Sequence, residues 1–143
     1  MWLNPIIDRT QYDVEYADMN RGDPNPLKGM RNASDLNRIG GNLRYARRLL
    51  RDVGYHIPEI LCRDDWGISD IPRESDIMKI RADVTALRAV PLFTPNTPDV
   101  PTLPYLHYEK LNDIERILFD VYTIIQKVHK SYIGTNEIGC GEL

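Results

Sequence analysis

Four arginines form the most regular arrangement of charged side chains in this sequence, with successive spacings of three, one and three residues. An α-helix turns by about 100° per residue, so these side chains would share an arc of about 100° on a helix. They are Arg44, Arg47, Arg48 and Arg51. This arginine stripe can contact the phosphates of a nucleic acid or an acidic face of another protein.

An acidic counterpart lies further along the chain, where Glu109, Asp113 and Asp120 share one side of a helical segment by the same geometry. Opposite charges on two faces of one small chain favour docking between proteins. Charged residues that are simply solvated are the plainer explanation of both sets. Both interpretations stay open at the level of sequence.

Metal-binding and catalytic patterns do not occur in the sequence. The histidines at positions 56, 107 and 129 are far apart and match no metal-ligand spacing such as HExxH. Glycine-rich phosphate loops and the GxSxG motif are missing. Cys62 and Cys140 do not form a CxxC pair, and we interpret them as free thiols. We therefore expect no catalytic residues, no metal and no cofactor, with a composite site formed on folding as the open alternative.

Trp66, Leu103 and Tyr105 complete the candidate interaction surface, and they lie in segments without a helical period. Trp66 and Tyr105 carry flat amphipathic rings of the kind that can stack on sugars. A small hydrolase or a carbohydrate-binding protein is therefore one alternative to a protein-binding module, although these two rings alone support it.

Length and composition are those of one folded domain. The chain has 143 residues, of which 42% are hydrophobic and 27% charged, close to average globular values. Its net charge of -3 favours neither nucleic acid nor an acidic membrane. No apolar run approaches the roughly 20 residues that span a bilayer, and residues 1–5 do not have the pattern of a signal peptide. We expect a single domain over residues 1–143 without membrane contact.

Capping residues and helical periodicity predict four helices. Thr10 is suited to cap a short helix of about residues 11–19, within an N-terminal arm that spans residues 1–31. The last helix has the cleanest period of three and four residues, which starts at Leu111 and is expected to end at Gly134.

A second long helix is expected to begin at Ser34, as its cap, and to end near Gly54. Gly40 and Gly41 lie inside this helix, where each costs about 1 kcal/mol relative to alanine. Such a cost is tolerated where another backbone must approach closely. The pair therefore predicts a tight crossing with a second helix.

The third helix is expected between Pro72 and Val90, where apolar residues recur at steps of three, four and three. The three long apolar stripes have only each other to cover them, which predicts a three-helix core over residues 32–133 and a short tail over 134–143. The expected fold class is mainly α, with three long amphipathic helices, one short N-terminal helix and long ordered connections.

The connection from residue 91 to the last helix is rich in proline. Prolines recur every third residue at positions 95, 98, 101 and 104, which is the period of a polyproline II helix. Such a strap of about 13 residues would span about 40 Å, close to the length of the last helix. We predict that the strap runs back along the outside of the bundle, with its prolines or Leu103 and Tyr105 touching apolar surface, and that the third and last helices are parallel.

Several segments occur together in a familiar order: Asn4-Pro5, DRTQ at 8–11, NASDLNRI at 32–39, Trp66, DIP at 70–72, ESD at 74–76, LNDIERIL at 111–118 and DVY at 120–122. In this order they resemble a small module in tail and host-adhesion proteins of phages that infect Gram-positive bacteria. The resemblance covers about residues 4–133. Within it, Ser34 and Asp35 would start a helix and Trp66 would act as an anchor.

The resemblance implies a non-enzymatic virion structural component, an adaptor or attachment module in a phage tail, baseplate or adhesion assembly. Such a protein would assemble in the host cytoplasm, contact other virion structural proteins, and occur as a homo-oligomer or in repeated copies. The arginine stripe leaves a nucleic-acid-binding or regulatory helical module as the alternative.

Overall fold

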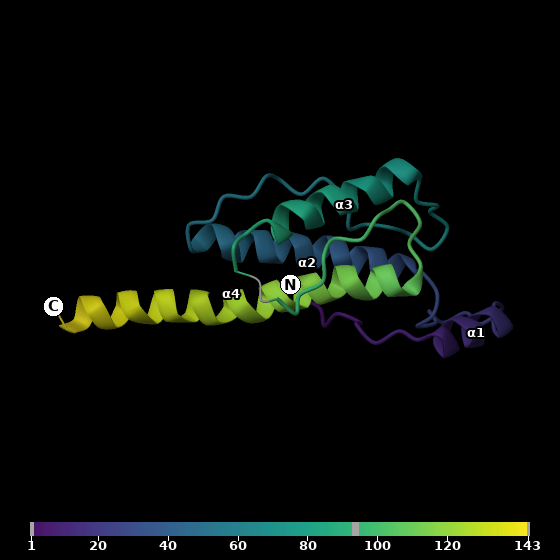
Figure 1. Cartoon of the computed structure of the whole chain (residues 1–143), viewed down its shortest axis with the longest axis horizontal. Coiled ribbons are helices and arrows are strands. Elements are labelled where there is room, and N and C mark those ends of the chain that lie inside the picture. Colours follow the sequence, from purple (N-terminus) through teal and green to yellow (C-terminus); the bar gives the residue numbers. More distant parts are fainter. Residues whose placement is uncertain (1, 93–94, 143) are drawn as a thin grey trace.

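A computed structural model shows four helices and no β-strand within residues 2–92 and 95–142, the part of the chain that it describes. Side chains are described in this part except those of residue 129 and residues 131–142. The helices are α1 (Gln11–Met19), α2 (Ala33–Asp52), α3 (Glu74–Arg88) and α4 (Tyr108–Glu142), as Figure 1 shows. The expected mainly α fold, with one short and three long helices, is confirmed.

Side-chain caps fix where the first two helices begin. At α1, the Thr10 hydroxyl accepts from the backbone N–H of Asp13 (3.3 Å), and the Asp13 carboxylate accepts from the backbone N–H of Thr10 (2.9 Å). At α2 the cap position is Asn32 rather than Ser34, so that prediction was wrong by two residues. The reason is Asp35, whose carboxylate accepts from the backbone N–H of Asn32 (2.9 Å) and so sets the start of the helix.

The three long helices run in the same direction (Figure 1). Two contacts between α2 and α4 show this directly, because Arg38 binds Glu115 and the ring of Tyr45 lies 6.1 Å from that of Tyr122. Tyr45 follows Arg38 by seven residues on α2, and Tyr122 follows Glu115 by seven residues on α4. The two helices therefore advance in the same direction. The predicted parallel arrangement of α3 and α4 is likewise observed, so both connections between long helices must travel back along the bundle.

The strap before α4 runs back along α3, as its hydrogen bonds show. The Nε of Arg88 donates to the carbonyl of Pro98 (3.1 Å), and the Nε of Arg81 donates to the carbonyl of Pro101 (3.2 Å). Residue numbers rise along the strap while they fall along α3. The strap is therefore antiparallel to the helix that it follows.

The extended part of the strap begins at residue 98 rather than at residue 91. Residues 89–92 and 95–97 form turns and bends instead. The cause is Thr97, which is buried and donates its hydroxyl to Asp120 on α4 (2.7 Å). Asp120 is thus half-buried and bound, and it does not belong to a purely solvent-facing acidic surface.

The apolar stripes identified in the sequence meet in one core. It contains Leu36, Ile39, Leu43, Ala46 and Leu50 of α2, Ile77, Ile80, Val84 and Leu87 of α3, and Leu111, Ile114, Ile117, Leu118, Val121 and Ile125 of α4. Burial of this many aliphatic side chains is the main force that holds the three helices together.

α4 is longer than the sequence suggested, because its helical backbone continues past Gly134 to Glu142. The predicted non-helical tail over residues 134–143 was therefore wrong as far as residue 142. A glycine weakens a helix by about 1 kcal/mol but does not stop it, and no proline follows Pro104 to do so. The side chains of His129 and Cys140, which the sequence analysis discussed, lie outside the described residues.

Candidate functional site

The long connection between α2 and α3, residues 53–73, is held against the bundle by two members of the arginine stripe. Arg47 donates through Nε to the carbonyls of Ile57 and Pro58, both at 3.0 Å. Arg44 donates to the carbonyls of Gly40 (3.0 Å) and Cys62. The carbonyls of Ile57, Pro58 and Cys62 lie outside any helix, so these two guanidinium groups satisfy acceptors that secondary structure does not.

The arginine stripe is consequently divided into two halves with different roles. Arg44 and Arg47 are half-buried and hold the connection, whereas Arg48 and Arg51 are exposed. The Arg48 guanidinium lies 5.1 Å from the centre of the Tyr45 ring, a distance typical of cation–π contacts. The four arginines of the stripe are therefore not equivalent, since two bind the protein's own backbone and two are exposed.

A buried carboxylate on α3 holds the same connection from the other side. Asp83 accepts from the backbone N–H groups of Leu61 (2.9 Å) and Cys62 (2.8 Å). Burial, and then the neighbouring Asp83, raise the pKa of the Cys62 thiol from 9.0 to about 12. Cys62 is thus a protonated, buried thiol, in agreement with its interpretation as a free cysteine.

Gly40 marks the place where this connection crosses α2. A Cβ atom at Gly40 would lie 2.7 Å from the carbonyl oxygen of Arg63, closer than real Cβ contacts. At Gly41 the corresponding position meets nothing within 4 Å. The predicted close approach is confirmed for one of the two glycines, but the backbone that approaches belongs to the connection and not to a helix.

Trp66 is buried in the core and is not a surface residue. Its backbone N–H donates to the Asn37 side-chain oxygen (2.6 Å), and its carbonyl accepts from the Asn37 side-chain nitrogen (2.9 Å). The Arg63 guanidinium covers the indole at 4.2 Å from the ring centre. Trp66 is therefore an anchor, as the resemblance implied, but its covered ring is poorly placed to stack on a sugar.

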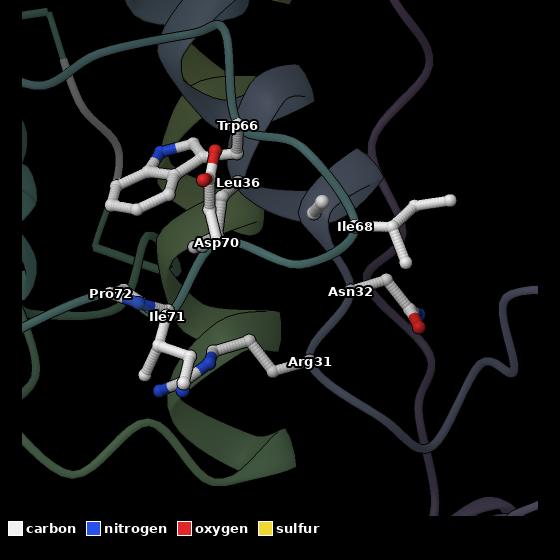
Figure 2. A pocket seen from close by; sticks show the side chains of 9 residues that line it. Arg31, Asn32, Leu36, Trp66, Ile68, Asp70, Ile71 and Pro72 are labelled. Carbon is white, nitrogen blue, oxygen red and sulfur yellow. The ribbon is translucent and has the colours of Figure 1, made fainter.

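A pocket of about 170 Å³ opens beside this tryptophan. We call it the Trp66 pocket; Figure 2 shows the residues that line it, Arg31, Asn32, Ala33, Leu36, Trp66, Ile68, Asp70, Ile71 and Pro72. Two of them, Ile68 and Ile71, are 100% and 84% exposed. In Figure 2 Ile68 points away from the indole, and Ile71 points toward the guanidinium end of Arg31.

The two exposed isoleucines are held in place by a closed turn. The Asp70 carboxylate accepts from the backbone N–H of Gly67 (2.7 Å), while the Asp70 N–H donates to the Gly67 carbonyl (3.1 Å). Arg63 adds an ion pair with Asp70 at 3.3 Å. The turn therefore presents Ile68 and Ile71 to solvent in a fixed position.

This arrangement suits binding of an apolar surface. Complete burial of one isoleucine side chain is worth about 1.5–3 kcal/mol, and a large apolar side chain left in water forgoes that gain. A partner that covers Ile68 and Ile71 would recover it with little ordering cost, because the turn is already formed. The charged groups of Arg31 and Asp70 lie at the rim and can select the partner.

The two strap residues of the predicted interaction surface do not line the Trp66 pocket. Leu103 is half-buried and packs against the core, as expected. Tyr105 is exposed, so it does not take part in the apolar contact that was predicted for the prolines or for Leu103 and Tyr105. The structure therefore does not gather the predicted surface residues into one site.

A buried set of four ionised side chains was missed by the sequence analysis, and we call it the ion cluster. The Arg9 guanidinium binds Glu115 (2.7 Å) and Asp35 (3.3 Å), and Arg38 binds Glu115 (2.5 Å) and Asp35 (2.7 Å). Two positive and two negative groups make the cluster neutral. One signal was available, since Glu115 lies on the apolar face of α4 between Leu111 and Leu118.

The N-terminal arm is fixed in the groove between α2 and α4 by side-chain amides. Asn42 binds both the N–H (2.9 Å) and the carbonyl (2.8 Å) of Leu3, and Asn112 does the same for Arg9 (3.1 and 2.9 Å). The Asn37 side chain binds the N–H and the carbonyl of Trp66 in the same way. Each amide thus offers one donor and one acceptor to an extended backbone, as a neighbouring strand would.

Neither a membrane-spanning helix nor a metal site is found in the described part of the chain. In the described part of the chain, no helix is long and apolar enough to cross a membrane. Among the same residues, no three His, Cys, Asp or Glu side chains are placed to hold a metal ion. Comparison of the chain with protein-family models, with curated proteins and with solved structures finds no match.

Proposed function

We propose that this chain is a non-enzymatic structural component of a phage virion, which joins parts of a tail or baseplate or mounts an adhesion protein. The resemblance of its segments to modules of such proteins supports this. Arg9, Asp35, Arg38 and Glu115, which form the ion cluster, all lie within those segments. The resemblance therefore includes residues that hold the N-terminal arm and the bundle together.

The observation that carries the proposal is the pair of isoleucines beside the Trp66 pocket. Ile68 and Ile71 are displayed by a turn that Asp70 closes, on a connection that Arg44 and Arg47 bind to the bundle. Exposed apolar groups on a rigid support are typical of surfaces that bind another protein. In an assembly, this patch would be covered by a neighbouring virion protein.

The proposal is tested on purified particles of the phage that encodes the chain. Quantitative mass spectrometry is expected to find the protein in a fixed copy number relative to the other tail proteins. The double variant Ile68→Asp/Ile71→Asp is expected to fold normally, as judged by circular dichroism, but to be missing from particles.

Leu61→Asp provides the matched control, because Leu61 is an exposed apolar residue of the same connection that does not line the Trp66 pocket. This variant should enter particles like the native protein. Intact virions without the protein would disprove the virion assignment. Normal incorporation of the double isoleucine variant would instead disprove the role of the patch.

The exposed half of the arginine stripe favours one second candidate, a nucleic-acid-binding or regulatory module. Arg48 and Arg51 are free to reach phosphates, and the affinity of such contacts falls steeply with salt. Binding of DNA or RNA at physiological salt that disappears in Arg48→Ala/Arg51→Ala would favour this candidate. Binding that is absent in the native protein would remove it.

A further inference from the structure

α1 displays a second apolar surface, part of which borders residues 26–29 of its own chain. Tyr12, Tyr16 and Met19 are spaced by four and three residues, so they share one face of the helix. They are 69%, 44% and 76% exposed. A helix that docks in a groove of another protein presents its anchors with this spacing.

The opposite side of α1 holds the helix in place. Ala17 is buried there. The backbone of Gly29 packs against the backbone of α1 so closely that a Cβ atom added at Gly29 would lie 2.0 Å from the carbonyl oxygen of Asp13. In Figure 1, α1 lies beyond the end of the three-helix bundle. Tyr12 and Tyr16 line an open pocket with residues 26–29, so this face is supported and only partly covered.

The charge around this outer face is negative. Residues 11–23 contain four carboxylates and one arginine, a net charge of -3, and Lys28, which lies beside Tyr12 and Tyr16, reduces this charge by one. Glu15 is exposed, and at 100° per residue it falls beside the stripe formed by Tyr12, Tyr16 and Met19. The complementary partner is a groove with a positive rim.

α2 carries such a groove on its outer side. Gly41, Arg44, Tyr45 and Arg48 line a shallow pocket of about 290 Å³ together with Asp64, whose carboxylate pairs with Arg44 at 3.5 Å. The four α2 residues are spaced as successive turns of one helix face, and Gly41 leaves its backbone open. Residues 44–51 contain four arginines and no carboxylate. We call this groove the α2 socket.

We propose that α1 of one copy docks in the α2 socket of a second copy. Tyr16 and Met19 would cover the open backbone at Gly41 and the stem of Arg48, and Glu15 would face the guanidinium group of Arg48. The same contact within one chain is not made, because α1 lies near the start of α2, and Arg48 is 15 residues further along, about 22 Å away. This interface stands on α1 and α2 alone and does not depend on the virion assignment.

The contact joins two different surfaces, so each copy still offers a free α1 and a free socket after one contact has formed. Contacts of this kind extend into rings or helical filaments rather than stopping at a symmetric dimer. This property leads to a sharp test with two variants. One variant, Glu15→Lys/Met19→Lys, blocks α1, and the other, Gly41→Gln/Arg48→Glu, blocks the socket.

Light scattering coupled to size exclusion is expected to show concentration-dependent assembly of the native protein. Each blocked variant alone should remain monomeric, with its self-affinity reduced at least about 10-fold. A mixture of the two blocked variants should give a 1:1 dimer and nothing larger, because it retains one intact α1 and one intact socket. Circular dichroism of each variant checks that the helices are intact.

Three results would overturn the inference. The first is that the native protein stays monomeric at about 1 mM, where even weak contacts form. The second is that a blocked variant assembles like the native protein. The third is that a mixture of the two blocked variants stays monomeric. The Ile68→Asp/Ile71→Asp variant is the control, and it should assemble like the native protein. Its failure in particles together with normal self-assembly would separate this interface from the patch of the proposed function.

Discussion

Glu115→Gln is expected to lower the free energy of unfolding by about 3–5 kcal/mol, because it removes one charge from a buried, neutral ion cluster. The Glu115 side chain has no exposed surface, and its oxygens accept from Arg9 (2.7 Å) and twice from Arg38 (2.5 and 2.9 Å). Glutamine keeps the volume but leaves two buried guanidinium groups with Asp35 as their only counter-ion in the cluster. For a domain of typical stability, about 5–15 kcal/mol, this is a large fraction of the total.

The measurement is urea denaturation followed by circular dichroism, together with the melting temperature, which should fall by about 10 °C or more. Glu109→Gln serves as the matched control. It makes the same change at an exposed position of the same helix, and surface changes of this kind stay within about 0.5 kcal/mol.

A double-mutant cycle tests whether charge balance is the cause. Arg9→Met should cost much less in the Glu115→Gln protein than in the native protein, because there it removes the excess positive charge. An equal or larger cost of Arg9→Met in the Glu115→Gln background would refute the reasoning. So would a loss of less than about 1 kcal/mol for Glu115→Gln alone.

Three further predictions concern the connection between α2 and α3. Gly41→Ala should stabilise the protein by up to about 1 kcal/mol, because nothing lies within 4 Å of the new methyl group. Gly40→Ala should destabilise it, because the carbonyl of Arg63 blocks the new methyl group. Similar free energies of unfolding for the two variants in urea denaturation would contradict this. The raised pKa of Cys62 predicts about a thousandfold less thiolate near pH 8 than an ordinary thiol has, so Cys62 should be alkylated slowly in a variant that lacks Cys140. Because the thiol must lose its proton more readily in the unfolded chain, the stability should also fall as the pH rises from 9 toward 12. Alkylation at the rate of the unfolded chain would contradict this prediction. Asn37→Ala should cost about 1–3 kcal/mol by leaving the backbone of Trp66 unpaired, and an unchanged midpoint of urea denaturation would show that water replaces the amide.

The helices were predictable because their causes are local. Thr10 and Asp13 form a capping box within four residues, and α1 begins at the predicted position. The apolar residues of α3 and α4 recur with the helical period, and the stripe from Leu111 to Ile125 is the one that is buried. The end of α4 was misplaced because the cost of a glycine is a preference and not a barrier.

The candidate sites were less predictable, since their partners are far apart in sequence. Arg44 and Arg47 have the same spacing whether they meet solvent or the carbonyls of the connection, and only the fold distinguishes the two cases. Ile68 looks like any apolar loop residue until its exposure is known. Glu115 was the exception, because a carboxylate within an apolar stripe already indicates a buried cation, and Arg9 proved to be one.

The ion cluster also affects the order in which the chain can fold. Arg9 and Glu115 are 106 residues apart in sequence, and Arg9 and Asn112 are 103 apart. At a synthesis rate of about 5–20 residues per second, Arg9 is made at least about 5 s before Asn112 and Glu115. The first segment to be made is therefore among the last to find its place. During that interval Arg9 remains hydrated, and the groove that will receive it is incomplete, because one wall of that groove is α4 itself.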